Sequence, residues 1–476
     1  MACSLVCKRR AECIYRAEHR FGGVCLTMFP TTERIRLPSR QPTLLFTVEL
    51  PQAYSHVHDL PVCIGELLLC VAGSSRFFPD RRLRPAQTTV LVALDRHHGG
   101  ERFRLEVPTR ALTGEITTSL VATEGPDETI LLAVLQHEDG LSVFVLAPDG
   151  CVLWEEQPYT ADKHTHRLTE VHLRTYDLSI KHWLSPVFPG PMQGYLVSWL
   201  YRQDRFARME YRRPGGDLPL WSQPAWAVGR CGHIVFGATV PRAQSRLVAY
   251  DLATGTPLWS IAGREAILAA VEREFVVVVY RPPTWEDAIA LAPKSTSNHG
   301  PIWPLAGMHC PPILAHEPAT GERLWSLWVP GYVVSLACGP GHMCAIVATE
   351  TGHPLLLCAD REGHLLWQQV LTSSVAERLV RWERGGPAMR PAWPMLVAVD
   401  AASLLLETPE QLTCLALHDG SVRWHCMTPA VRPSFLPRSE DRMVSRSCTL
   451  VHNGILYRRE GTRLWAYAEN QSALSE

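Results

Sequence analysis

The sequence predicts an all-β fold, a single eight-bladed β-propeller of four-stranded blades, on three observations. A short sequence recurs along the chain, apolar runs of strand length precede its copies, and the last unit lacks one strand. The recurring sequence is clearest at residues 247–259, LVAYDLATGTPLW, and at residues 313–325, ILAHEPATGERLW. Similarity at a fixed period is the mark of a repeat architecture, so the repeat decides the fold class.

Each copy of the repeat is predicted to be a β-hairpin whose second strand carries an aromatic residue near its start. The seven aromatic residues are Phe103, Trp154, Trp221, Trp259, Trp325, Trp367 and Trp424. In six copies a glycine lies four residues before the aromatic, and in five copies a leucine directly precedes it. Glycine supplies the positive φ of a tight turn, and nearby Asp and Thr side chains bond the turn backbone. The aromatic that follows is large enough to fill the gap between neighbouring sheets.

The strands that come before the hairpins complete the blades. Apolar runs of strand length lie at residues 275–280, 343–348 and 395–399, each ahead of a hairpin. Short strands at even spacing, separated by turn residues, are typical of propeller blades.

The two ends of the chain are predicted to form one blade together. Residues 449–457 and 463–467 supply inner strands of a last unit, which has no outer strand of its own. The run at 43–50 has strand character and no hairpin partner, so pairing the N- and C-terminal strands would close the ring and remove open edges. Seven complete units and one shared unit give eight blades. Because the third unit, roughly 165–225, is divergent, seven blades are the alternative count.

The pattern Ala-x-Asp-x-x-Thr-Gly-x-x-Leu-Trp resembles the repeat of quinoprotein-like (PQQ-like, BamB-like) β-propellers. The resemblance covers residues 42–470, and the Trp-Asp dipeptide of WD40 repeats is absent from the sequence. The family includes pyrroloquinoline quinone dehydrogenases and the BamB-type outer-membrane assembly scaffold. The resemblance implies the fold, whereas function depends on sites carried by the fold. We therefore expect an N-terminal extension at 1–41, the propeller at 42–470 and a short tail at 471–476.

Composition narrows the range of partners and compartments. The net charge is −1, so no general attraction to nucleic acid or to an anionic membrane is expected. No apolar run approaches the roughly 18–20 residues of a membrane span. The 15 cysteines are scattered without a Cys-x-x-Cys motif, which favours a reducing compartment, and the first ten residues lack the apolar core of a secretory signal. We expect a cytoplasmic protein.

Residues 1–27 fit neither the repeat nor a targeting signal. They contain Cys3, Cys7, Cys13 and Cys25 together with several arginines. This favours a true start at Met28, and a disordered or metal-binding extension is the alternative.

The sequence motifs give little support to an enzymatic function. The sequence has no phosphate-binding loop and no Gly-x-Ser-x-Gly elbow. The resemblance implies PQQ and Ca²⁺ for the dehydrogenases, yet the export signal and the vicinal cysteine pair of that class are missing. We therefore assign no catalytic, cofactor-binding or metal-ligating residue. The histidines of the third unit follow no recognised metal spacing: His164, His166, His172 and His182.

Two insertions are not explained by the repeat and are the candidate partner-binding segments. Residues 281–312 contain Trp285 and Trp303, and residues 381–394 contain Trp382 and Trp393. Loops of this length are often functional, and exposed Trp is a common anchor of protein interfaces. Packing of these Trp side chains on a neighbouring blade is the competing interpretation.

The sequence therefore predicts a non-enzymatic intracellular β-propeller that acts as a protein–protein interaction scaffold. We expect the partner to be a protein, and we expect binding neither to nucleic acid nor to a membrane. A PQQ-dependent oxidoreductase is the first alternative, and a BamB-like envelope assembly scaffold is the second.

Overall fold

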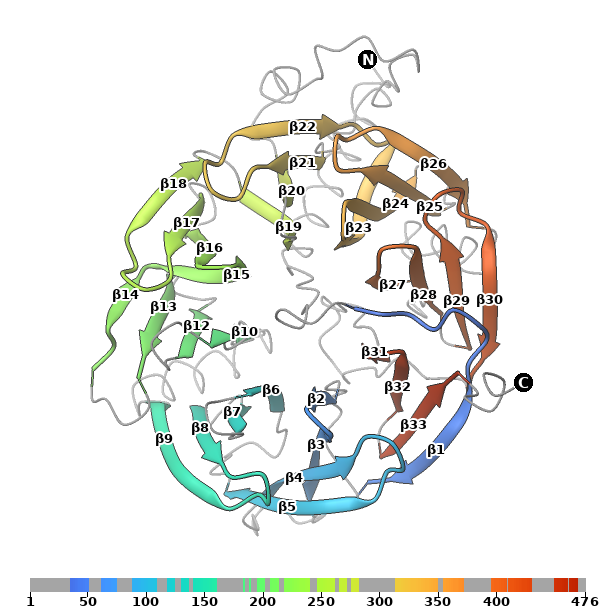
Figure 1. Cartoon of the computed structure of the whole chain (residues 1–476). Coiled ribbons are helices and arrows are strands. Elements are labelled where there is room, and N and C mark those ends of the chain that lie inside the picture. Colours follow the sequence, from blue (N-terminus) through green and yellow to red (C-terminus); the bar gives the residue numbers. More distant parts are fainter. Residues whose placement is uncertain are drawn as a thin grey trace, which may run out of the picture.

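The structure is a computed structural model of the chain. It describes residues 35–50, 61–74, 88–108, 118–124, 130–136, 140–160, 183–184, 188–189, 195–201, 206–213, 218–239, 246–261, 265–271, 275–281, 313–349, 354–371, 395–408, 410–429, 449–460 and 462–469. Within these ranges the regular structure is all β, and the strands form eight antiparallel sheets. Figure 1 shows the sheets arranged around a ring, as in a β-propeller.

We name the sheets A to H. Sheet B contains β2 (Val62–Ile64), β3 (Leu67–Ser74), β4 (Thr88–Asp95) and β5 (Glu101–Pro108). Sheet C contains β6 (Thr118–Glu124), β7 (Ile130–Gln136), β8 (Gly140–Leu146) and β9 (Val152–Thr160). Sheet D contains β10 (Trp183–Leu184), β11 (Phe188–Pro189), β12 (Tyr195–Tyr201), β13 (Phe206–Arg212) and β14 (Trp221–Gln223). Sheet E contains β15 (Ala225–Cys231), β16 (Ile234–Thr239), β17 (Leu247–Asp251) and β18 (Pro257–Ile261).

The remaining sheets follow in chain order. Sheet F contains β19 (Glu265–Val271), β20 (Val276–Arg281), β21 (Ile313–His316) and β22 (Arg323–Leu327). Sheet G contains β23 (Gly331–Gly339), β24 (His342–Thr349), β25 (Pro354–Asp360) and β26 (Leu365–Val370). Sheet H contains β27 (Met395–Val399), β28 (Ser403–Glu407), β29 (Gln411–Ala416) and β30 (Val422–Met427). Sheet A contains β31 (Thr449–His452), β32 (Ile455–Glu460), β33 (Arg463–Ala468) and β1 (Thr43–Glu49).

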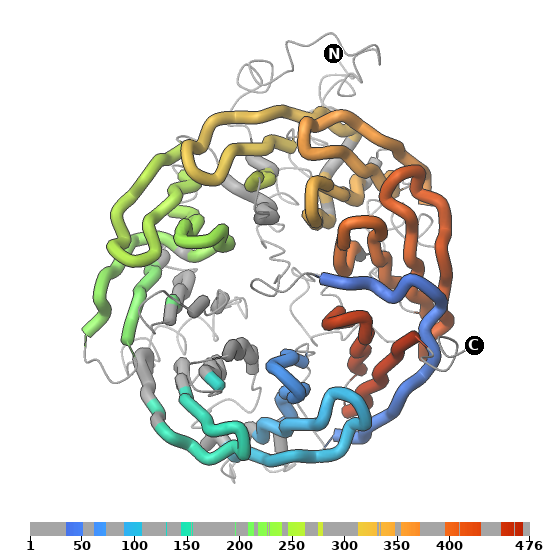
Figure 2. Tube along the Cα trace, in the orientation of Figure 1, coloured from blue at the N-terminus to red at the C-terminus, as the bar shows by residue number. Residues whose placement is uncertain are grey.

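Sheet A is built from both ends of the described chain. Its order is β1-β33-β32-β31, and β1 pairs antiparallel with β33 from Thr43 opposite Ala468 to Glu49 opposite Arg463. Figure 2 shows the N-terminal strand in blue beside the last strands in red. This is the pairing that the sequence predicted for residues 43–50. The divergent third unit forms sheet D, in which the short strands β10 and β11 both pair with β12.

In most sheets a β-bulge lies just before the aromatic, so that the two residues ahead of it both face outward. In sheet E, Ala249 lies opposite Trp259 and Tyr250 lies opposite Pro257, so Leu258 is the extra residue of the bulge. The extra residue immediately precedes the aromatic in seven sheets: Leu45, Arg102, Leu153, Leu258, Leu324, Leu366 and Arg423. A bulge re-aims the side chains that it contains. Leu258 is 46% exposed, whereas Trp325, an aromatic of the repeat in the neighbouring sheet, is 9% exposed.

An eighth aromatic was not predicted from the sequence. Phe46 follows the bulge residue Leu45 in β1, so it holds the place that Trp holds in other sheets. Its ring lies against Gly99 of sheet B, where a Cβ would be 2.7 Å from Phe46 Cδ2. The similarity was hidden because the repeat's turn and upstream strand do not precede Phe46 in the chain.

The aromatic residues join each sheet to the next. Five indole N–H groups donate to a carbonyl oxygen near the corresponding turn of the following sheet. The pairs are Trp221 with Leu252 (2.9 Å), Trp259 with Pro318 (2.9 Å), Trp325 with Arg361 (2.7 Å), Trp367 with Leu417 (2.5 Å) and Trp424 with Pro38 (2.8 Å). The ring of each Trp is large and apolar with one polar group, so a single side chain packs and hydrogen-bonds across the seam.

The repeat glycine is required both for its positive φ and for its close contact with an aromatic ring, and the two requirements can be separated by mutation. Gly363 has φ of +84°, and a Cβ there would lie 2.5 Å from Trp325 Cγ. Gly341 has φ of +70° but faces open space. Both alanine variants carry the left-handed backbone cost of about 1–2 kcal/mol. We expect G363A to lose about 1–3 kcal/mol more than G341A, because the indole must move. Urea unfolding followed by Trp fluorescence measures the difference, and equal losses would contradict the packing role.

Residues 35–42, which we call the N-terminal arm, replace the missing turn of sheet A. The Leu37 N–H donates to Asp400 Oδ2 (2.8 Å), and the Gly454 N–H donates to the Arg36 carbonyl (3.0 Å). Leu37 is buried in the apolar cluster between sheets H and A. The packed chain therefore includes residues 35–41, which the sequence had assigned to an extension ending at 41.

Candidate functional site: the two faces of the ring

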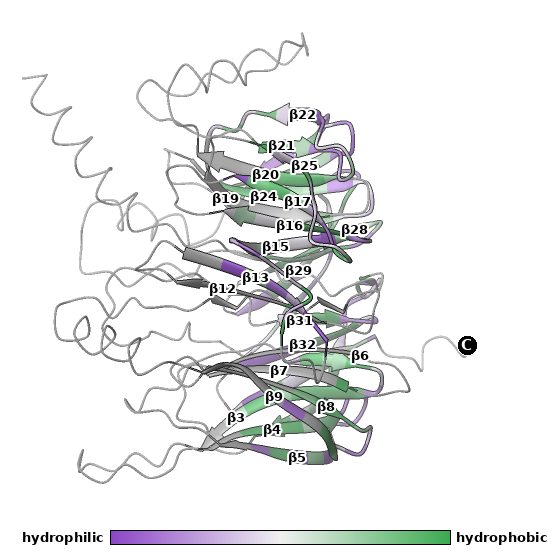
Figure 3. Cartoon of the chain, turned by 90° about the vertical axis from the view of Figure 1, so that its left-hand side faces the viewer, coloured by the Kyte–Doolittle hydropathy of each residue, from purple (hydrophilic) through white to green (hydrophobic). Residues whose placement is uncertain are grey.

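The strand order gives the ring two different faces. Because consecutive strands are antiparallel, the connection between the first two strands of a sheet and the Gly-containing hairpin turn lie at one face. The connection between the second and third strands, and the link to the next sheet, lie at the other. We call these the turn face and the insertion face. Figure 3 shows the ring edge-on, with the strands running across its thickness.

The strands that flank the two predicted insertions have their adjoining ends at the insertion face. Residues 281–312 connect the second strand of sheet F, β20, to the third, β21. Residues 381–394 belong to the link between β26 of sheet G and β27 of sheet H. The strand ends that flank the two segments therefore lie at the same face, in consecutive sheets.

The four candidate Trp residues lie outside the described residues: Trp285, Trp303, Trp382 and Trp393. The histidines of the third unit lie outside them as well: His164, His166, His172 and His182. Only the strand ends that flank the insertions are placed by the structure.

On the turn face, the recurrent aspartates cap their own turns, as predicted. Asp251 Oδ1 accepts from the Thr254 N–H (2.9 Å), and Asp419 Oδ1 accepts from the Ser421 N–H (2.9 Å). The hydroxyl and backbone N–H of Ser421 hold the pKa of the Asp419 carboxyl below its usual value. These contacts explain the aspartates without a catalytic role.

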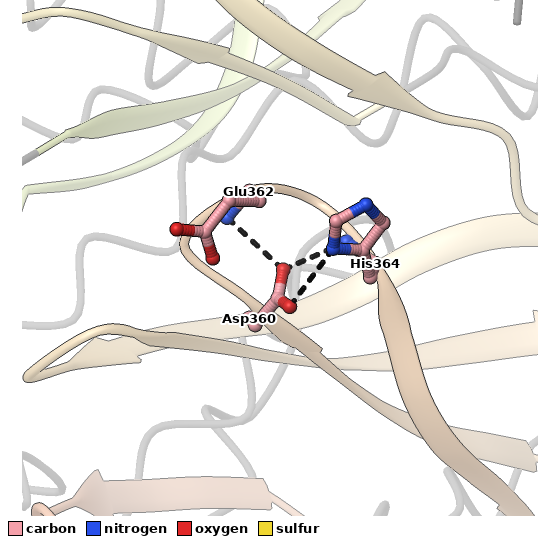
Figure 4. Close-up of side chains that lie close together, drawn as sticks. All are labelled: Asp360, Glu362 and His364. Carbon is pink, nitrogen blue, oxygen red and sulfur yellow. Dashed lines mark hydrogen bonds and ion pairs between the residues drawn. The ribbon is translucent and has the colours of Figure 1, made fainter.

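One turn brings together possible metal ligands. Ligand atoms of Asp360, Glu362 and His364 lie within 4.8 Å of one another (Figure 4). Asp360 Oδ1 accepts from the backbone N–H groups of Glu362 (3.0 Å) and His364 (2.8 Å), and His364 Nδ1 lies 3.1 Å from Asp360 Oδ2. Glu362 and His364 are exposed. Because these contacts are those of a capped turn, the group is not by itself a metal site.

A polar network on the turn face links sheets A and B. Arg96 pairs with Glu66 (2.7 Å), and its Nη1 lies 3.0 Å from Nε2 of His452. The Tyr457 hydroxyl donates to the Arg96 carbonyl (3.0 Å). Sequence reasoning missed this network, because Arg96 lies more than 350 positions from both His452 and Tyr457.

Asp95 anchors the turn that carries Arg96. Burial alone would raise the pKa of its carboxyl, but hydrogen bonds from Arg102 and from the N–H groups of His97 and His98 outweigh burial and lower it to about 2. The side chains of His97 and His98 are exposed. The network is ionic and structural, and His97 and His98 remain accessible to solvent.

A second charged group is buried between sheets H and A. Arg458 is fully buried, and its Nη1 lies 3.2 Å from Oε1 of Glu407, which is 6% exposed. Thr449 Oγ1 donates to the same Glu407 oxygen (3.0 Å), and Arg458 Nη2 donates to the Thr408 carbonyl (3.0 Å). The sequence signal was Arg458 itself, a charged residue that directly follows the apolar run 455–457.

The described cysteines behave as small apolar residues. All nine are free thiols, and six are buried. Burial raises the pKa of Cys70 and of Cys414 to about 11, which disfavours the reactive thiolate. These thiols are poor candidates for nucleophiles.

Comparisons with known proteins concern the fold alone. No protein-family model matches the chain, and no curated protein matches it. Similar solved structures include BamB from Moraxella catarrhalis, with a TM-score of 0.38 and 12% identity over 80% of this chain and 98% of that one. Saccharomyces cerevisiae Sqt1 has a TM-score of 0.47 and 9% identity, and the match covers 90% of this chain and 98% of that one. The β-propeller domain of the Trilobed protease from Pyrococcus furiosus, described as having an open velcro topology, has a TM-score of 0.38 and 10% identity. That match covers 77% of this chain and 94% of that one.

The described part of the chain contains no helix with the length and apolar character needed to cross a membrane.

Proposed function

We propose that this chain is an eight-bladed PQQ-like β-propeller, closed by pairing its terminal strands, that acts as a non-enzymatic scaffold in the cytoplasm. Eight sheets around a ring and the shared sheet A support the architecture. Free buried cysteines support a reducing compartment. The propeller spans 42–470 in this proposal, joined by the arm, with a tail at 471–476.

The scaffold binds a protein partner at the insertion face. The observation that carries this proposal is the topology, which puts the strand ends that flank both Trp-containing insertions at that face, in consecutive sheets. Trp is enriched among the residues that dominate interface energies. The net charge of −1 argues against nucleic acid or an anionic membrane as the partner.

The test is capture of a partner by the full chain in its own cells. We expect a protein recovered with the wild-type chain to be lost when Trp285, Trp303, Trp382 and Trp393 are changed to alanine. Truncating interface anchors typically costs at least about 2 kcal/mol each, so binding should weaken by roughly 30-fold or more. Quantitative mass spectrometry of the recovered proteins measures the loss.

The matched control changes the opposite face. Arg361 and Glu362 are exposed on the turn face, and R361A/E362A should retain the same partner. Loss with this control, or retention with the four-Trp variant, rejects the insertion face.

A further inference from the structure

Eight of the nine histidines in the described part of the chain lie at the turn face. The eight are His97, His98, His233, His316, His342, His364, His418 and His452, whereas His425 lies on the outer strand β30. Histidine is the side chain whose charge ordinarily changes between about pH 5 and 8. A change of pH in this range therefore acts mainly on the turn face of the described structure.

Two of these histidines bind the same arginine, at the seam between sheets A and B. Arg96 Nη1 donates to Nε2 of His452 (3.0 Å), at the end of β31, and Arg96 Nε donates to Nε2 of His97 (3.1 Å) in its own turn. The third contact of the guanidinium is with Oε1 of Glu66 (2.7 Å). We call Arg96, His97 and His452 the clasp.

The clasp requires both imidazoles to be neutral. A guanidinium group has five N–H donors and no acceptor, and it stays charged in proteins. Each contact is therefore a hydrogen bond only while the imidazole Nε2 is an unprotonated acceptor. A proton on Nε2 of His452 would remove that bond and place two cations 3.0 Å apart.

Burial makes this requirement stricter at His452 than at His97. His452 is 7% exposed and the side chain of Arg96 is 15% exposed, so the two groups are only weakly screened. The amide nitrogen of Asn453 is a second donor to Nε2 of His452 (3.1 Å). The side chain of His97 is 54% exposed, and its Nε2 lies 3.0 Å from Oε2 of Glu66. A proton on His97 would make it compete with Arg96 for Glu66, whereas a proton on His452 would oppose Arg96 directly.

The neighbours of the clasp do not share this dependence on pH. The other charged or titratable groups at this end of the seam are Cys63, Glu66, Asp95, His98, Arg102 and Tyr457. Carboxyl groups ordinarily titrate below about pH 5, and thiols and phenols above about pH 8. The pKa of Asp95 is about 2, and burial raises the pKa of Tyr457. His98 is exposed, and its ion-pair partner is Asp95 (3.2 Å).

We propose that the clasp is an acid-sensitive switch that holds sheet A to sheet B. Sheet A is the sheet to which both ends of the chain contribute. Two residues after His452, the Gly454 N–H donates to the carbonyl of Arg36 in the N-terminal arm (3.0 Å). The clasp therefore lies where segments from both ends of the chain close the ring. Neutral imidazoles keep the bridge through Arg96, and proton uptake releases it and loosens the seam at the turn face.

Acid weakens the seam because the opened seam binds more protons than the closed one. His452 is neutral in the closed seam, whereas in an opened seam it takes up a proton below the ordinary histidine midpoint of about pH 6.5. The equilibrium constant for opening should therefore rise about tenfold between about pH 7.5 and 5.5. The stabilising effect of the clasp is complete above this range and is lost as the pH falls.

Hydrogen exchange of the full chain tests the proposal. It is measured by mass spectrometry on peptides that cover β31 and β32, and it is corrected for the pH dependence of chemical exchange. We expect the protection of these amides in the wild type to fall about tenfold from about pH 7.5 to 5.5. In H452Q it should fall less than about twofold, because glutamine offers Arg96 an acceptor that does not titrate.

The matched control is H425Q, because His425 is exposed on β30 and lies outside the clasp. It should respond to pH as the wild type does. If H452Q does not fold, R96Q replaces it, and removing the cation should also abolish the pH response of the seam. A wild-type seam that keeps its protection at acid pH overturns the proposal. So does a response that persists in H452Q or R96Q, or one that H425Q abolishes.

Discussion

Replacing Arg458 with methionine is expected to lower the free energy of unfolding by about 3–5 kcal/mol, the usual consequence of removing one partner of a buried ion pair. Glu407 Oε1 would keep the Thr449 hydroxyl as a donor but lose the guanidinium, while the carboxylate stays 6% exposed. Its negative charge would then be buried without the cation that faces it. The seam between sheets H and A would weaken, where the last complete repeat meets the sheet shared by both ends of the chain.

A double variant separates the charge from the packing. R458M/E407L removes both members, and apolar replacement of a buried pair is often neutral or stabilising. We expect it to recover most of the stability that R458M loses. R104M is the exposed control, because Arg104 and Glu101 are both 44% exposed and such pairs contribute about 0–1 kcal/mol. Chemical denaturation measures all three, and a loss below about 1 kcal/mol for R458M would contradict the role of the pair.

The parts of the fold that sequence reasoning recovered are those in which the informative residues are close together in the chain. A Gly turn and a Leu-Trp strand lie within five residues of each other, so their pattern predicts a hairpin directly. The pattern is strong because each hairpin makes contacts at two seams. Gly255 lies against the ring of Trp221 from the preceding sheet, and Trp259 of the same hairpin lies against Gly321 of the following sheet. Each copy is thus constrained at two seams.

The parts that were missed depend on distant partners. Phe46 could have been recognised by the Leu-Leu-Phe run alone, but its strand pairs with residues more than 400 positions away. The Arg96–His452 contact spans 356 positions, and no local pattern predicts it. The candidate binding segments stay predictions, although the topology now assigns their flanking strand ends to one face.

The exposed residues of the outer strands were also difficult to predict from the sequence. From the sequence, the aromatic of each repeat was explained by packing between neighbouring sheets, and the leucine before it was assigned no role. Alternation along the strand already places the leucine opposite the aromatic, whereas the single-residue bulge turns the residue before the leucine outward as well, as at Pro257 and Arg323. The bulges were therefore detectable only once the register of the outer strands was known.

Removing the N-terminal arm is expected to destabilise the ring more than the loss of the Leu37 side chain alone. A chain beginning at residue 43 keeps β1 but loses the burial of Leu37, which is 4% exposed. It also loses the acceptor of the Trp424 indole and the donor to Asp400. Loss of a buried leucine costs about 2–5 kcal/mol and each lost hydrogen bond about 1 kcal/mol, so the total is on the order of 5 kcal/mol.

The comparison that tests this role is a chain beginning at residue 35, which keeps every described contact of the arm. We expect its unfolding curve to match that of the full chain, while the chain beginning at 43 unfolds at lower denaturant. L37A in the full chain should reproduce roughly half of the loss by removing the apolar contact alone. If the chain beginning at 43 were as stable as the full chain, β1 alone would hold the two ends together. Because the arm takes the place of a hairpin turn that no contiguous sequence provides, we expect the opposite result.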